Sequence, residues 1–158
     1  MAVHQVTKDA AVRLALPEDI AVVAPRIREA DRQEIWASHH FTPAEALDFS
    51  FRRPGMRFTI LYKNEPVAMF GASRLSLAGG GAPWLLGTDQ IVKVTIPFLR
   101  HSREYVQLML QEYRFLQNHV DVRNDLSIKW LKFCGFTFHA AVRYGAEQLP
   151  FYRFTMGG

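Results

Sequence analysis

The chain has 158 residues, of which 49% are hydrophobic, and it carries 12 Phe and 3 Trp. Its length and composition predict one domain over residues 1–158 with a real core, and they exclude a disordered chain. The net charge is +4 and the basic residues are scattered, so a solvated mixed surface is favoured over a concentrated nucleic-acid patch, although contact with nucleic acid stays open as an alternative.

Other features narrow the class further. No apolar run reaches the roughly 18 residues that a membrane span needs. The first residues lack a signal-peptide core, so secretion by a signal peptide is not expected. Cys134 is the only cysteine, which excludes an internal disulfide and fits a reducing compartment. Because Cys134 lies at an apolar helix end, we expect its side chain to be buried and to pack as a small hydrophobic group rather than to act as a nucleophile.

The N-terminal part predicts a strand followed by helix. Residues 1–11 are polar and predict a loose lead-in, and residues 12–16 predict a short strand. A helix is expected over 17–39, since Pro suits its first turn and acids suit its positive end. Pro25 interrupts this helix, which predicts a kink or two helices.

The faces of the 17–39 helix differ in chemistry. One face is mostly apolar and consists of Ile20, Val23, Ile27, Ala30, Glu34 and Ala37. The charged residues mostly on the other faces are Arg26, Arg28, Glu29, Asp31 and Arg32. We favour a salt-bridged exposed face for these charges, with the wall of a substrate site as the alternative. The adjacent His39 and His40 point about 100° apart on a helix, so they predict a polar helix end rather than a metal site.

The middle of the chain predicts a helix and a hairpin. Thr42 and Glu45 form a capping-box pattern for a helix that ends before Pro54. Residues 56–62 and 67–71 predict two strands joined by a tight turn, with an extension of the second strand to residue 75 as the alternative. The glycine triplet 79–81 precedes a strand instead of opening a helix, so it predicts a flexible connection and not a phosphate loop.

Two further strands flank a long helix. Residues 83–88 predict a short central strand, Thr88 and Asp89 then resemble a helix cap, and a helix is expected over 95–113. The next strand is expected over 115–122. A strand–helix–strand order of this length predicts a right-handed parallel crossover, with 83–88 and 115–122 as neighbours that diverge.

The stretch VDVRNDLSIKWLKFCGF, residues 120–136, predicts a strand, a capped helix and a stop. Asn124 is a typical N-cap and Gly135 a typical residue just past a helix end. If Asn124 acts mainly as a cap, Asn124→Ala should cost about 1 kcal/mol of stability and Asn124→Asp should be nearly neutral. Residues 136–144 and 149–156 then predict a closing hairpin.

This stretch resembles the acyl-CoA-binding core of GNAT-type (GCN-related) N-acetyltransferases. The residues that carry the resemblance are Asn124, Ser127, Ile128, Gly135 and Phe136. The resemblance implies an α/β (α+β) fold over nearly the whole chain. It has a mixed, largely antiparallel seven-stranded sheet flanked by about four helices, in the order β-α-α-β-β-β-α-β-α-β-β.

In that family the pantetheine arm lies between the two diverging strands, here 83–88 and 115–122, and the pyrophosphate lies on the following helix. The resemblance makes four residues candidates for a vestigial CoA cleft: Trp84, Thr88, Asp89 and Asn124. The chain departs from the family pattern at three points. Leu131 replaces the usual Tyr general acid, residues 88–97 lack the glycines of the phosphate loop, and the strand 83–88 lacks the usual carboxylate base. No catalytic residue is assigned, and no metal site is predicted.

Residues 84–158 also resemble the small GNAT-like internal virion proteins of T7-like, short-tailed bacteriophages. The shared features are Trp84 with Thr88-Asp89-Gln90, a helix ending near Glu112-Tyr113, the helix with Asn124 and Ser127-Ile128, and a tail of Phe154-Thr155 with Gly157-Gly158. Such proteins are associated with the phage head or its assembly.

Two hypotheses of function follow. The favoured one is a phage structural or assembly protein, located in the virion or the host cytoplasm, with other virion proteins as partners, no cofactor and acetyl transfer lost. The alternative is an acetyl-CoA-dependent N-acetyltransferase that acts on a phage or host amine. The first is favoured because Asn124 is the only family residue of the CoA site in place, and Asn also caps helices.

Overall fold

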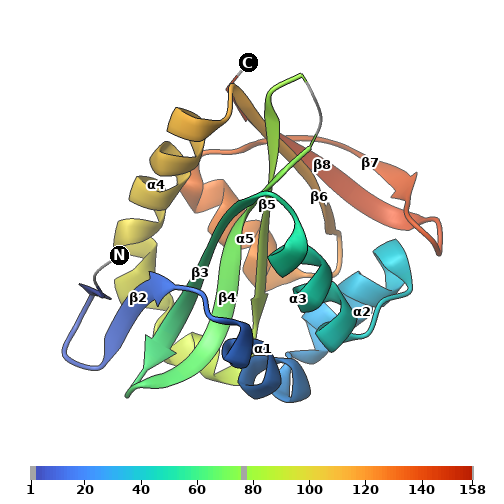
Figure 1. Ribbon diagram of the computed structural model, residues 1–158. Helices are drawn as coiled ribbons and strands as arrows, with labels where there is room; N and C mark the ends of the chain where they lie inside the picture. Colours follow the sequence, from blue (N-terminus) through green and yellow to red (C-terminus); the bar gives the residue numbers. More distant parts are fainter. Residues whose placement is uncertain (1–2, 76–77, 158) are drawn as a thin grey trace.

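The computed structural model describes residues 3–75 and 78–157 (Figure 1). One sheet runs through the molecule in the order β1-β2-β3-β4-β5-β6-β8-β7, and within it only the β5–β6 pair is parallel. Its strands are β1 (His4–Gln5), β2 (Ala10–Leu14), β3 (Gly55–Tyr62), β4 (Glu65–Arg74), β5 (Gly80–Gly87), β6 (Phe115–Asp121), β7 (Thr137–Tyr144) and β8 (Leu149–Gly157).

Five α-helices and two short 3-10 helices accompany this sheet in the described residues. They are α1 (Pro17–Val23), η1 (Ala24–Arg26), α2 (Glu29–His39), α3 (Pro43–Arg52), η2 (Asp89–Lys93), α4 (Thr95–Glu112) and α5 (Asp125–Cys134). No helix in the part of the chain that the structure describes is long and apolar enough to cross a membrane.

The predicted order of elements is confirmed, with two differences in detail. The sheet has eight strands rather than seven, because His4 and Gln5 pair with β2 as the short strand β1 where a lead-in was expected. The interruption at Pro25 resolves into separate helices, with η1 between α1 and α2. The capping box of α3 is confirmed, since Thr42 Oγ1 accepts from the N–H of Glu45 while Glu45 Oε1 accepts from the N–H of Thr42.

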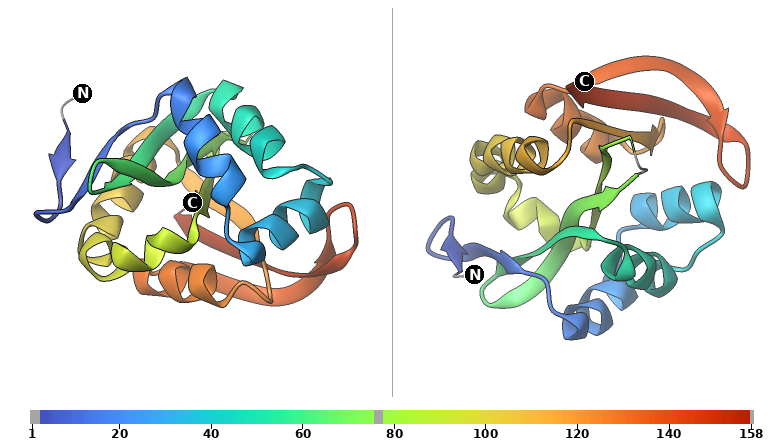
Figure 2. Two further views of the ribbon diagram at one scale, coloured as in Figure 1. Left: turned by 90° about the horizontal axis from the view of Figure 1, so that it is seen from below. Right: turned by 45° about the horizontal axis from the view of Figure 1, so that its top comes forward.

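Helices cover both faces of the sheet (Figure 2). Each face has its own hydrophobic core. Phe70 packs in the core under α4 and α5, while its neighbour Met69 packs in the core under α1, α2 and α3. Successive side chains of a strand point to opposite faces, so β4 supplies both cores from one buried strand.

The diverging pair β5 and β6 is confirmed as a parallel neighbour pair, with hydrogen-bonded register only at Gly80↔Phe115 and Gly81↔Leu116. Aromatic rings lie against both glycines at this junction. A Cβ atom on Gly81 would lie 2.4 Å from the Tyr113 ring, and one on Gly80 would lie 2.5 Å from the Phe115 ring. The sequence predicted a flexible connection here, but these two glycines are ordered strand residues that the close approach of the rings requires.

Candidate functional site

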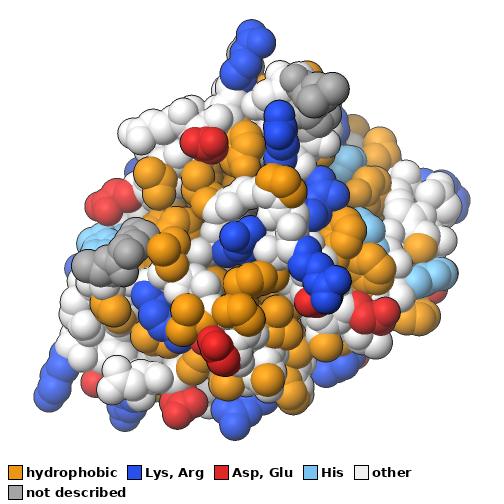
Figure 3. All heavy atoms as spheres, in the orientation of Figure 1, with side chains coloured by type: hydrophobic (Ala, Val, Ile, Leu, Met, Phe, Trp, Pro, Cys, Tyr) orange, Lys and Arg blue, Asp and Glu red, His pale blue; other side chains and the backbone are white. Residues whose placement is uncertain are grey.

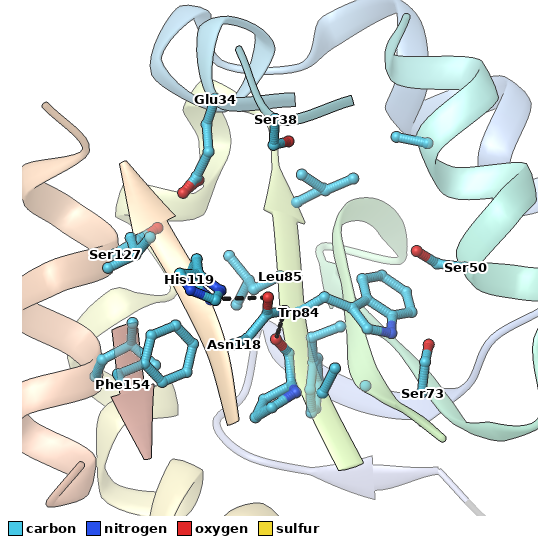
Figure 4. Close-up of a pocket in the computed structure, with 18 of the residues that line it drawn as sticks. Glu34, Ser38, Ser50, Ser73, Trp84, Leu85, Asn118, His119, Ser127 and Phe154 are labelled. Carbon is cyan, nitrogen blue, oxygen red and sulfur yellow. Dashed lines mark hydrogen bonds between the residues drawn. The ribbon is translucent and has the colours of Figure 1, made fainter. Parts of the chain in front are cut away.

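A cleft of about 390 Å³ lies at the split between β5 and β6. Its lining comes from α2 and α3 on one face of the sheet and from α4 and α5 on the other, so the cleft passes between the two strands. Most of the lining is apolar, and its polar side chains include Glu34, Ser38, Asn118, His119 and Ser127. Figure 4 shows Glu34 and Ser38 reaching from α2 toward the side chains on the two strands.

Asn118 ties the two diverging strands together inside the cleft. Its Nδ2 donates to the carbonyl oxygen of Pro83 on β5 at 2.8 Å, and its Oδ1 accepts from the N–H of His119 at 2.8 Å. Both bonds are visible in Figure 4. A side chain therefore continues the connection between the strands just beyond their last backbone register pair.

Two carboxylates of α2 accept backbone N–H groups at the open end of the split. Asp31 Oδ2 accepts from the N–H of Gly87, the last residue of β5, at 3.0 Å. Glu34 Oε1 accepts from the N–H of Asp121, the last residue of β6, at 2.9 Å. Buried N–H groups that strand pairing leaves free need such partners, so α2 satisfies both strands at once.

The Asn124 side chain joins these carboxylates. Its Nδ2 donates to Asp31 Oδ1 at 3.0 Å and to Glu34 Oε2 at 2.8 Å, and its Oδ1 accepts from Arg28 Nη2 at 3.2 Å. Asn124 occupies the N-cap position of α5, but its side chain makes no capping hydrogen bond. The prediction of a side-chain cap was therefore wrong, because the amide is used in a fully buried contact with α2.

The charges of α2 separate into a buried and an exposed group. Arg28 and Asp31 form an ion pair of 3.0 Å with side chains only 11% and 0% exposed, whereas Glu29 and Arg32 pair on the surface. The favoured prediction of an exposed charged face is thus correct for Glu29 and Arg32 and wrong for Arg28 and Asp31. Burial raises the pKa of the Asp31 carboxyl, and the Arg28 guanidinium opposes that rise.

Glu34 is the titratable group of most chemical interest in the cleft. Burial raises the pKa of its carboxyl to about 8, the N–H of Asp121 opposes this, and the neighbouring Asp31 carboxylate adds to it. A carboxyl with a pKa near neutrality is suited to accept or donate a proton. Sequence reasoning gave Glu34 no role, although a lone acid on the apolar face of a helix was the signal.

His119 on β6 is a second titratable group of the cleft. Its ring stacks on Tyr144 with centroids 3.8 Å apart, and burial lowers the pKa of the imidazole, assisted by Arg153. The cleft therefore combines a carboxyl of raised pKa with an imidazole of lowered pKa.

The four residues expected at a vestigial CoA cleft lie in different surroundings. Trp84 on β5 lines the cleft, while the other three are not among its lining residues. The hydroxyl of Thr88 donates to the carbonyl of Val67 and accepts from the N–H of Gln90, and Asp89 is exposed in η2. Asn124 lies behind Glu34 in the buried network described above. The structure thus brings together Asn124 and α2, a contact that no sequence spacing indicates.

The connection between β5 and α4 is wound into η2. The N–H groups of Ile91 and Val94 bond to carbonyls within this turn, and both side chains are fully buried. Leu131, at the position of the family's tyrosine, lines the cleft. Burial raises the pKa of the nearby Cys134 thiol, which fits the prediction that Cys134 is not a nucleophile.

Solved structures share this architecture. Ard1 from Thermoplasma volcanium superposes with a TM-score of 0.71 at 19% identity, over 94% of this chain and 97% of that one. Ribosomal-protein-S5-alanine acetyltransferase from Vibrio fischeri gives 0.66 at 16% identity, over 99% and 96%. Aminoglycoside acetyltransferase AAC(6')-Ib, solved in complex with coenzyme A, gives 0.65 at 14% identity, over 94% of both chains. The chain therefore has the GNAT fold.

Comparison of sequences adds one similarity. The family described as "Bacteriophage T7, probable scaffold protein Gp13" matches residues 66–142, just under half of the chain. This segment runs from β4 to β7 and contains both diverging strands with the helices α4 and α5. No curated protein sequence matches the chain significantly.

We predict that Asn124→Ala destabilises the fold by about 2–4 kcal/mol, because it leaves buried charged groups without partners. Asn124→Asp should cost more at pH 8, since it removes both amide donors and adds a carboxyl beside Asp31 and Glu34. Protonation relieves that repulsion, so the cost should shrink at pH 5. Denaturant unfolding at both pH values measures this, with the exposed neighbour Asp125→Ala as the control. A variant Asn124→Asp as stable as the parent at pH 8 would restore the capping interpretation.

The Glu34 carboxyl predicts a pH dependence of stability. Its folded pKa of about 8 lies above the model-compound value of 4.5, so between these values the folded state holds a proton that the unfolded state has lost. The free energy of unfolding should therefore fall as pH rises through this window, by up to about 1.4 kcal/mol per pH unit, and level off above it. Glu34→Gln should remove this component from unfolding curves measured between pH 5 and 9. Glu29→Gln, on the exposed face of the same helix, should retain it, and identical pH profiles for the two variants would contradict the assignment.

Proposed function

We propose that the chain is a structural or assembly protein of a bacteriophage particle, of the internal head protein type, built on a GNAT fold that no longer transfers acetyl groups. Its partners are then other virion proteins, and its location is the virion or the cytoplasm of the infected cell. The similarity of residues 66–142 to a phage scaffold family supports this assignment.

The main support for the proposal is that backbone N–H groups at the ends of β5 and β6 are already hydrogen-bonded within the protein. In the GNAT family the pantetheine arm lies between the diverging strands. In this chain the N–H groups of Gly87 and Asp121 are already bonded to Asp31 and Glu34. A ligand entering there has to compete with the side-chain acceptors Asp31 and Glu34, which are held in place by Asn124.

The connection that follows β5 supports the same conclusion. A phosphate cradle needs free N–H groups and glycines that let the backbone approach the phosphates. Here residues 88–97 contain no glycine, Thr88, Ile91 and Val94 use their backbone or side-chain groups within η2, and Pro97 lacks an N–H. The side chain of Ile96 is 71% exposed at this position, which suits contact with protein better than contact with a phosphate.

The surface supports protein partners over nucleic acid. On the face shown in Figure 3, Lys and Arg side chains are interspersed with hydrophobic and acidic ones instead of gathering in one block. Proteins that bind nucleic acid concentrate basic residues along one face, so protein contact is the favoured mode.

A second function has one specific observation in its favour. Glu34 lines the cleft with its pKa raised to about 8, which is the property of a general base near neutral pH. An acetyl-CoA-dependent N-acetyltransferase with Glu34 as base and a phage or host amine as acceptor is therefore the alternative.

The assembly function predicts that the chain is present in purified particles of its phage at a fixed copy number. Quantitative mass spectrometry of gradient-purified particles measures this, with a soluble host enzyme as the control for contamination. Absence from particles, together with newly acetylated proteins in infected cells, would instead support the acetyltransferase.

We predict that acetyl-CoA at ~1 mM raises the melting temperature by less than about 2 °C. A ligand at 100 times its dissociation constant stabilises a fold by about 2.7 kcal/mol, or very roughly 5–10 °C here, so even ~10 μM affinity is then excluded. Desulfo-CoA is the control, because it keeps the pyrophosphate and tests the anion site alone. A saturable shift well above 2 °C, with acetyl transfer that Glu34→Gln abolishes, would overturn the proposal.

A further inference from the structure

Three potential metal ligands meet at the edge of the sheet, far from the cleft residues of α2. They are His4 on β1 and His101 and Glu104 on α4, and one ligand atom from each lies within 4.8 Å of the others. His101 and Glu104 are three residues apart, so they share one face of the helix. In Figure 1 the N-terminal strand lies beside α4, which brings His4 to them.

The His4 ring is oriented by a hydrogen bond. Its Nδ1 lies 2.9 Å from the hydroxyl of Tyr105, the residue that follows Glu104 on α4. This contact leaves Nε2 as the free nitrogen of the ring. Metal-binding histidines commonly use their second nitrogen in such a bond, which fixes the ring and its tautomer.

The His101 ring presents a nitrogen that lacks a hydrogen bond. Its Nδ1 is shielded from solvent and has no hydrogen-bond partner among the described residues. Glu104 Oε1 lies 3.5 Å from it, which is close enough for an ion pair when the ring is charged but does not satisfy the geometry of a hydrogen bond. A shielded imidazole nitrogen that faces a carboxylate is thus left without a donor or an acceptor.

The separation of His101 Nδ1 from Glu104 Oε1 suits two ligands of one ion. Two atoms bound at 2.0–2.2 Å with tetrahedral angles lie about 3.3–3.5 Å apart, which matches the Nδ1–Oε1 distance. Two imidazoles on one tetrahedral ion have ring centroids about 5 Å apart. The rings of His4 and His101 have centroids 5.0 Å apart and planes at 88°, so neither ring stacks on the other.

We propose that His4, His101 and Glu104 bind a divalent transition-metal ion, for which zinc is the best match, with water completing the coordination. Two imidazoles and one carboxylate suit zinc, whereas calcium and magnesium prefer sites made of oxygen ligands alone. The sequence predicted no metal site, because only the fold brings the N-terminal histidine to the helix.

A metal here fastens the N-terminal strand to the body of the protein. β1 pairs with β2 through only two register pairs, His4↔Val12 and Gln5↔Ala11. Binding to β1 and α4 together adds a connection between the edge of the sheet and the helix that covers it. The expected effect of the site is therefore structural.

The test is a titration of the full-length, chelator-treated chain with ZnCl₂ by calorimetry, and with Co²⁺ by visible absorption. We expect one ion per chain with a dissociation constant of about 10 μM or lower. At a zinc concentration of 100 times the dissociation constant, the melting temperature should rise by about 5 °C. Each of His4→Gln, His101→Gln and Glu104→Gln should weaken binding at least about tenfold. Tyr105→Phe, which keeps the ring but frees His4, should weaken it about tenfold.

Two control variants address other ligands. His40→Gln removes a histidine that pairs with Glu147 at 3.3 Å and has no third ligand, and Cys134→Ser removes the one thiol. Both should leave affinity and stoichiometry unchanged. The proposal is overturned if no ion binds below about 1 mM, or if binding persists unchanged in all three ligand variants, which would place the metal elsewhere.

Discussion

The structure depends on the satisfaction of backbone donors where β5 and β6 separate. Where parallel strands diverge, the N–H and C=O groups that would pair across the gap lose their partners. Unpaired buried N–H groups are costly, so an open split needs acceptors from another part of the chain. Helix α2 provides them with Asp31 for β5 and Glu34 for β6.

The two carboxyl groups accept the N–H groups that the carbonyl oxygens of a neighbouring strand would otherwise accept. Asp31 and Glu34 lie three residues apart on α2, so they share one face of the helix and reach the ends of both strands. Arg28 balances the charge of Asp31, and the two amide hydrogens of Asn124 bond to Asp31 and Glu34. A polar network of this kind is stabilising only while every member is satisfied, so its residues act as one unit.

Local signals in the sequence were sufficient for the elements. The apolar periodicity of α4, the capping box of Thr42 with Glu45 and the stop at Gly135 depend on residues a few positions apart. The site was harder, because its contacts join residues separated by most of the chain. Asn124 is a residue type typical of helix caps. Nothing near it in the sequence indicates that its amide bonds to Arg28, Asp31 and Glu34 instead.

Burial of charge was the second feature that sequence could not give. Asp31 and Glu29 lie on the same helix and both have a basic neighbour within three positions. What distinguishes Asp31 from Glu29 is that α2 lies against the end of β5. A bridge between Ile27 and Thr88 holds the start of α2 at this place. The short strand β1 was missed for a similar reason, since two residues are too few to show an alternating pattern.

The narrow junction at Gly80 and Gly81 has a mechanical consequence. Five strands lie on one side of it and three on the other. In the described residues, β5 and β6 are paired at two register positions, next to which the N–H of Arg114 donates to the carbonyl of Gly79. Beyond these pairs, side chains connect the two strands. The Asn118 amide bonds to Pro83 within the cleft, and Asp31 and Glu34 of α2 bond to the ends of β5 and β6. The sheet is therefore expected to bend most easily at the boundary between β5 and β6. A partner that binds α2 would act directly on the angle between the five strands on one side and the three strands on the other.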